Sequence, residues 1–104
     1  MQVIERKRNS GKTTMLLHYM ELVSNSIMVK RTEEDAKQVF RLSKLLGLHI
    51  HKNRFIGMTH IDDKYRDGQI ILIDDADCIM KMHSKQGYNL IKHADIITIT
   101  KGEN

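Results

Sequence analysis

Two short groups of residues in this chain carry side chains that suit phosphate chemistry. The first is Gly11-Lys12-Thr13, at the junction between a polar turn and an apolar-periodic segment. A glycine lets the backbone approach a phosphate, a lysine carries charge toward its terminal oxygens, and a threonine hydroxyl suits Mg²⁺. The second group is Asp74-Asp75, which directly follows an apolar run. Together the two groups predict a site for a nucleotide with Mg²⁺.

The loop that ends at Gly11 is predicted to wrap the phosphates. The first turn of a helix has backbone N–H groups without partners and a partial positive charge, so the backbone would hold an anion there together with Lys12. The full pattern for such a loop is G-x-x-x-x-G-K-[ST], and Arg6 stands at its first glycine position. The alternative interpretation is a basic turn before an ordinary helix. The candidate nucleotide-binding residues are Arg8, Asn9, Ser10, Gly11, Lys12, Thr13 and Thr14.

The two acids are expected to have different roles. In a parallel sheet, ligands gather at the carboxyl ends of the strands, so Asp74 is expected near the loop. There it and Thr13 would hold Mg²⁺, Asp74 through water. Asp75 is the candidate base that orients or deprotonates an attacking water, and Lys12 is the second catalytic candidate. The alternative is that Asp74, Asp75 and Asp77 only cap the next helix.

A sheet and several helices are needed to bring these groups together. Strands alternate with helices along the chain, which predicts a single α/β domain over residues 1–104, with helices on both faces of a mainly parallel sheet. Thr32 and the acids after it predict a helix start, and Gly47 predicts its end. The predicted strands are 2–5, 27–29, 70–73 and 96–100. The other predicted helices are 12–24 and 77–93, and the second of these is expected to be broken near Gly87. The segment 48–58 is expected to be extended, and the segment 59–69 is polar.

Composition bears on several other classes of protein. The net charge of +4 gives a mild attraction to polyanions, which nucleotide phosphates, DNA or RNA would explain. Aromatic residues make up 5% of the chain, too few for a platform that stacks single-stranded nucleic acid. No apolar run approaches the roughly 20 residues of a membrane span, and a lone cysteine, Cys78, suits the cytoplasm.

His49 and His51 could face one side of a strand as zinc ligands do, but no further ligands complete that site.

In order along the chain, these motifs resemble those of P-loop NTPases, in the branch that pairs a phosphate loop with an apolar strand ending in acids. The run from Arg8 to Thr13 is similar to the deviant loops of viral DNA-packaging terminases, which often carry arginine three positions before the last glycine. The run from Asp95 to Gly102 is similar to the threonine-rich strand that terminases and helicases use to couple hydrolysis to movement. That likeness implies coupling or sensor roles for Thr98 and Thr100.

The resemblance implies a three-layer α/β/α P-loop NTPase fold with about five strands, ATP and Mg²⁺ as ligands, and a phage origin. It also implies that strand 96–100 lies between strands 2–5 and 70–74, with strand 27–29 on the far side of 70–74. Three departures limit it: Arg6 replaces a glycine, Asp75 replaces the usual glutamate, and no second motor or nuclease domain follows. We therefore expect slow hydrolysis that depends on a protein partner or on self-association.

Two alternatives stay open at this point. One is a P-loop fold that has lost catalysis and docks on a host or viral ATPase. The other is a small basic nucleic-acid-binding protein. Nucleotide binding is favoured by the presence of Lys12, Thr13, Asp74 and Asp75. The docking protein is favoured by Arg6 and by the lack of a second motor or nuclease domain.

Overall fold

The computed structural model describes residues 1–7 and 11–100. Within them, five parallel strands form one sheet in the order β1-β5-β4-β2-β3. This order confirms the expectation that the strand at 96–100 separates the first strand from the strand before the acids. The strands are β1 (Gln2–Arg6), β2 (Ser26–Lys30), β3 (Phe55–Gly57), β4 (Ile70–Ile73) and β5 (Ile96–Thr100).

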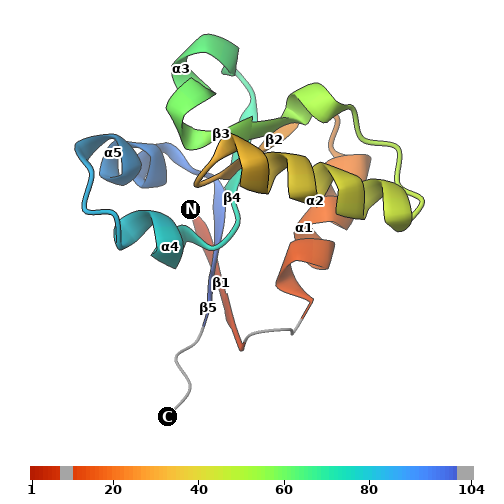
Figure 1. The fold of residues 1–104 in the computed structure, drawn as a ribbon, viewed down its shortest axis with the longest axis horizontal. Coiled ribbons are helices and arrows are strands. Elements are labelled where there is room, and N and C mark those ends of the chain that lie inside the picture. The colour runs from red at the N-terminus through yellow and green to blue at the C-terminus, as the bar shows by residue number, and fades with distance from the viewer. Residues whose placement is uncertain (8–10, 101–104) are drawn as a thin grey trace.

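Helices cover both faces of the sheet. In Figure 1, α1 and α2 lie on one side of the strands and α4 and α5 on the other. The prediction of helices on both faces of a five-stranded parallel sheet is therefore confirmed. The helices are α1 (Lys12–Leu22), α2 (Glu33–Leu45), α3 (Ile61–Lys64), α4 (Ala76–Met80) and α5 (Lys85–His93), with 3-10 turns at Lys52–Arg54 and Met58–His60. None of these helices has both the length and the apolar character that crossing a membrane requires.

The alternation of side chains along the strands divides the core into two layers. Successive residues of a strand point to opposite faces. On β2, Met28 therefore joins the layer under α1 and α2, whereas Ile27 and Val29 join the layer under α4 and α5. On β4 the same rule sends Leu72 toward α1 and Ile73 toward α4. Burying each side chain of this size stabilises the fold by about 1.5–3 kcal/mol. The two apolar layers therefore fix which face of the sheet the following residues of each strand point to.

Helix α2 begins and ends where the sequence predicts. The Thr32 side chain accepts a hydrogen bond of 3.1 Å from the backbone N–H of Asp35, which satisfies one of the unpaired donors of the first turn. At the other end Gly47 has φ of +76°, a left-handed conformation that favours glycine.

Two regions differ from the sequence prediction. The segment expected to be extended has only a three-residue strand, β3, between two 3-10 turns, and the polar segment after it contains the short helix α3. The break in 77–93 lies at 81–84 rather than near Gly87, which sits in the first turn of α5. A Cβ atom at Gly87 would lie 2.8 Å from Cγ2 of Ile79, so this glycine allows α4 and α5 to pack closely.

Arg54 has a structural role that the sequence did not reveal. Its guanidinium lies against the end of α1 and donates hydrogen bonds to backbone carbonyl oxygens there. It donates hydrogen bonds to the carbonyl oxygens of Met20 at 2.6 Å, Val23 at 2.8 Å and Ser26 at 2.9 Å. The carbonyls of Met20 and Val23 lie at the end of α1, where the cation also complements the negative end of the helix dipole.

Replacing Arg54 with alanine is expected to lower the free energy of unfolding by about 2–3 kcal/mol, because hydrogen bonds from a charged donor are lost and carbonyls lose their partners. Urea denaturation measures the change. Arg41→Ala is the matched control, since the Arg41 side chain is 66% exposed, and we expect it to change stability by less than about 0.5 kcal/mol. Equal stability of the Arg54→Ala and Arg41→Ala variants would contradict the capping role.

Candidate phosphate-binding site

Strand register brings the candidate site together at the carboxyl edge of the sheet. Val29 of β2 is paired with Ile73 of β4, so Lys30 and Asp74, one residue further on, lie side by side. Both are two residues beyond side chains that face α1, namely Met28 and Leu72, and so they face α1 as well. Thr98 follows Ile96 of β5 by two residues and has the same direction.

The shortest hydrogen bond of the site joins the start of α1 to the end of β4. The Thr13 hydroxyl donates a hydrogen bond of 2.6 Å to Oδ2 of Asp74, and the two residues are 61 positions apart in the sequence. Asp74 is only 1% exposed. The two residues predicted to hold Mg²⁺ are thus neighbours in space.

The second oxygen of Asp74 is held by Thr98. The Thr98 hydroxyl donates to Oδ1 of Asp74 at 2.7 Å and accepts a hydrogen bond of 2.8 Å from the backbone N–H of Asp75. Thr100 lies one step further along the same face, where its hydroxyl donates to Oδ1 of Asp75 at 3.3 Å. Thr98 and Thr100, for which the resemblance implies coupling or sensor roles, therefore contact Asp74 and Asp75 between them.

Two lysines balance the charges of the two acids. The ammonium of Lys12 lies 3.2 Å from Oδ1 of Asp75. The ammonium of Lys30 lies 3.2 Å from Oδ2 of Asp74 and 3.4 Å from Oδ2 of Asp75. Sequence reasoning missed Lys30. The signal that could have found it is its position directly after a buried strand, at the same sheet edge as the acids.

The pKa values of Lys30 and Asp75 are shifted by their charged neighbours. Burial lowers the pKa of Lys30, but the charges of Asp74 and then Asp75 outweigh that effect and raise it above 10.5. Burial likewise raises the pKa of Asp75, but the charge of Lys30 and the hydrogen bond and charge of Lys12 lower it below 3.8. The stabilisation from these ion pairs is therefore present at neutral pH. It is lost as pH falls through the lowered pKa of Asp75 or rises through the raised pKa of Lys30.

The backbone at Asp75 separates two interpretations of the acids. Asp75 has φ of 56° and ψ of 53°, a left-handed conformation that is uncommon for a residue other than glycine, and its side chain makes no capping hydrogen bond to α4. Its carboxylate instead faces Lys12 and Lys30. Asp77 also points across to β5, where it accepts a hydrogen bond of 3.3 Å from the N–H of Thr100. Helix capping alone does not explain these acids.

The start of α1 has the features that a bound phosphate needs. Gly11 has φ of 82°, and, apart from its chain neighbours, no atom of the described residues lies within 4 Å of the position where a Cβ would stand. Lys12 is buried, and its ammonium is paired with Asp75. Hydroxyl and carboxylate oxygens, which Mg²⁺ prefers, meet at Thr13 and Asp74. Thr14 follows in the first turn of the helix, while Arg8, Asn9 and Ser10 lie outside the described residues.

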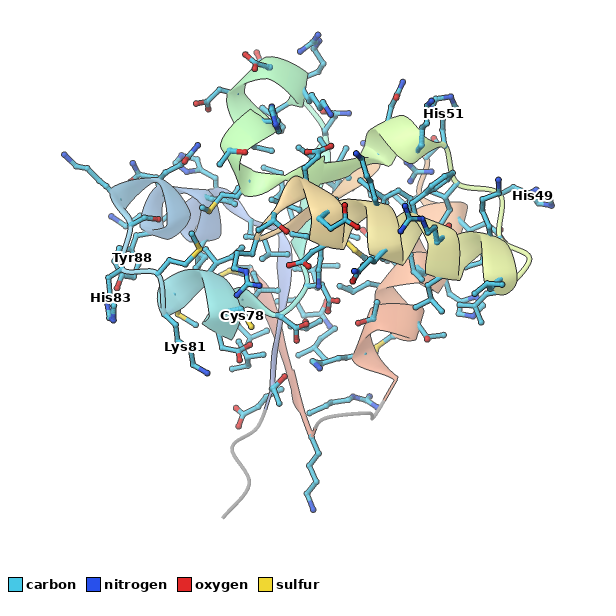
Figure 2. All side chains as sticks on the ribbon, viewed as in Figure 1. His49, His51, Cys78, Lys81, His83 and Tyr88 are labelled. Atoms are coloured by element: carbon cyan, nitrogen blue, oxygen red, sulfur yellow. The ribbon has the colours of Figure 1, made fainter. Side chains whose placement is uncertain are left out.

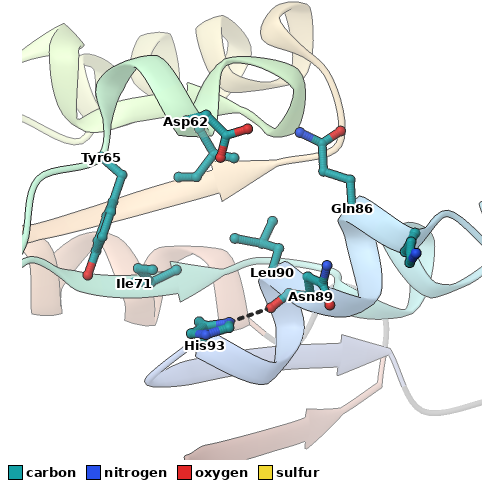
Figure 3. Close-up of a pocket in the computed structure, with 9 residues that line it drawn as sticks. Asp62, Tyr65, Ile71, Gln86, Asn89, Leu90 and His93 are labelled. Carbon is teal, nitrogen blue, oxygen red and sulfur yellow. Dashed lines mark hydrogen bonds between the residues drawn. The ribbon is translucent and has the colours of Figure 1, made fainter.

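Other candidate features lie away from this edge. Figure 2 shows His49 and His51 on the segment after α2 and His83 at the opposite side of the molecule, with Cys78 between them on α4. Residues 1–7 and 11–100 contain no group of three or more histidine, cysteine or acidic side chains that could hold a metal ion. A cavity of about 620 Å³ lies between α3 and α5, with Tyr65, Ile71 and Leu90 among its lining residues (Figure 3). None of the predicted site residues lines it.

Comparison with known proteins gives no independent identification. No protein-family model, curated protein or solved structure matches this chain.

Replacing Thr98 with valine is expected to lower the free energy of unfolding by about 1–3 kcal/mol, because a buried carboxylate and a buried N–H lose their partner while the volume hardly changes. Thermal unfolding measures the change. The Thr98→Ser variant keeps the hydroxyl and is expected to retain most of the stability. A Thr98→Val protein as stable as the parent would show that this hydroxyl does not hold the two acids.

Proposed function

We propose that this chain binds the phosphates of a nucleoside triphosphate, ATP with Mg²⁺, between the start of α1 and the ends of β4 and β5. The observation that carries the proposal is the 2.6 Å contact between Thr13 and Asp74. The hydroxyl of Thr13 at a helix start and the buried carboxylate of Asp74 at a strand end are the two groups that the sequence predicts to hold Mg²⁺. They come from distant parts of the chain, so local structure alone does not account for their meeting.

The polar groups around that contact supply what a phosphate requires. The N-terminus of α1 offers unpaired N–H groups and a partial positive charge. Lys12 exchanges its ion pair with Asp75 for a phosphate oxygen, a charge-assisted contact of the same kind. Mg²⁺ held by Thr13 and, through water, by Asp74 would neutralise charge on the terminal phosphates. ATP, rather than another triphosphate, rests on the resemblance to P-loop NTPases.

Slow hydrolysis is part of the same proposal, with Asp75 as the base. Its carboxylate is already paired with Lys12, Lys30 and Thr100, and its pKa is lowered. A more acidic group is a weaker base, so proton transfer from water to Asp75 is unfavourable while these contacts persist. A protein partner that adds an arginine or rearranges the acids would relieve this limit.

The edge of the sheet offers a place for such a partner. Among the described residues, β1 pairs only with β5, and four of its five residues are exposed. Unpaired strand edges accept strands from other chains. The same edge supports the second candidate function, a docking protein without catalysis, in which the ion pair of Lys12 with Asp75 would persist. The nucleic-acid-binding alternative is less favoured, since Lys12, Lys30 and Arg54 are all engaged within the fold.

Replacing Lys12 with alanine is expected to weaken ATP binding by roughly 10- to 100-fold, because the lost charge-assisted contact contributes about 1.5–3 kcal/mol. Isothermal calorimetry in the presence of Mg²⁺ measures the affinity. Lys37→Ala removes the same charge from an exposed position on α2 and is the control. If Lys12→Ala binds ATP as tightly as the Lys37→Ala protein, the phosphate site is placed wrongly.

Replacing Asp75 with asparagine is expected to slow ATP hydrolysis by about 10²-fold or more with little loss of ATP affinity, as for removal of a general base. Asp74→Asn is expected instead to weaken the dependence of binding on Mg²⁺. Phosphate release, followed over a range of protein concentrations, measures turnover.

The parent's turnover per molecule should rise with protein concentration if self-association activates it. Unchanged turnover in Asp75→Asn would remove Asp75 from the reaction, and brisk turnover independent of concentration would refute activation by self-association.

A further inference from the structure

Lys30 contacts the oxygen of Asp74 that also faces Thr13. Oδ2 of Asp74 accepts the Thr13 hydroxyl at 2.6 Å and lies 3.2 Å from the Lys30 ammonium. We propose that Lys30 is a tethered cation that competes with Mg²⁺ for Asp74, so that the binding of nucleotide phosphates at this site depends less on Mg²⁺ than it would without Lys30. The inference rests on the proposed phosphate site and adds to it a residue that sets its metal dependence.

The competition follows from the shared oxygen. A divalent cation held between Thr13 and Asp74 would stand close to the ammonium of Lys30. Two positive charges a few ångströms apart repel each other strongly where water is scarce. Asp74 is 1% exposed and the Lys30 side chain 12% exposed, so solvent screens this repulsion poorly. Either the ammonium withdraws or the metal binds weakly.

The surroundings of Lys30 oppose its withdrawal. Its backbone is fixed on β2, where Val29 is paired with Ile73 and Lys30 with Gly57 of β3. Its ammonium is held by a second carboxylate, Asp75, at 3.4 Å. A buried ammonium that leaves both acids without reaching water loses its compensation, which is unfavourable. Lys30 is therefore a resident cation of the site rather than a side chain that happens to lie near it.

The charge balance also gives Lys30 a role once phosphate is bound. In the structure, Lys12 and Lys30 together balance Asp74 and Asp75. When Lys12 turns toward a phosphate, Lys30 still contacts both acids and reduces their repulsion of the incoming anion. The role that Mg²⁺ has in screening acids from phosphates is thus partly supplied by the chain itself.

Calorimetric titration with ADP tests the inference without hydrolysis. The ADP affinity of each protein is measured with EDTA and again with saturating Mg²⁺, and the ratio of the two affinities gives the metal dependence. We expect the ratio for Lys30→Gln to be about tenfold higher than the ratio for the parent, since repulsion between nearby like charges is removed. Lys30→Arg, which keeps the cation, and Lys37→Gln, which removes an exposed charge on α2, should resemble the parent.

The outcomes separate this inference from the function on which it rests. Equal ratios for the parent and Lys30→Gln, with ADP bound by both, overturn the role of Lys30 and leave the phosphate site standing. Absence of ADP binding by the parent overturns both. If Lys30→Gln does not fold, the double variant Lys30→Gln/Asp75→Asn, which removes one charge of each sign, decides the question. A raised ratio in the double variant supports competition at Asp74, and a ratio equal to that of Asp75→Asn alone overturns it.

Discussion

The buried carboxylate of Asp74 is the group on which the arrangement of this site depends. An ionised carboxylate removed from water costs several kcal/mol unless charged or hydrogen-bonding partners compensate it. Its partners Thr13, Lys30 and Thr98 come from the start of α1, the end of β2 and the middle of β5. A shift of one residue in the register of β2 or β5 would turn Lys30 or Thr98 to the opposite face of the sheet. The charge at Asp74 therefore ties the position of α1 to the pairing of three strands.

Much of the fold follows from signals that are local in the sequence. The apolar run at 70–73 and the threonine-rich run at 96–100 are long enough to identify buried strands, and the cap at Thr32 and the glycine at 47 set the ends of α2 within a residue or two. The order of the strands is not local, and the sequence predicted it only through the resemblance of its motifs to P-loop NTPases. The structure has that order.

The features that were missed depend on contacts between distant segments. Lys30 and Arg54 look like ordinary surface cations, and only the neighbours supplied by the fold make one a partner of the acids and the other a cap for α1. The break between α4 and α5 was misplaced because glycine usually ends a helix, whereas Gly87 is needed for its closeness to Ile79. The expectation that Asp74 lies near the loop before α1 followed from the rule that the carboxyl ends of parallel strands gather at one edge, and Thr13 and Asp74 are in contact.

Whether this edge binds a nucleotide is the claim on which the account depends. Calorimetric titration of the unmodified protein with ATP and saturating Mg²⁺, with thermal unfolding followed in parallel, tests it most directly. If the phosphate site is placed correctly, one ATP binds saturably per chain and the unfolding temperature rises as ATP is added, because a ligand that binds only the folded state stabilises it. No heat of binding and no rise in unfolding temperature at roughly 1 mM ATP, the upper end of the usual range for enzyme substrates, would contradict that placement.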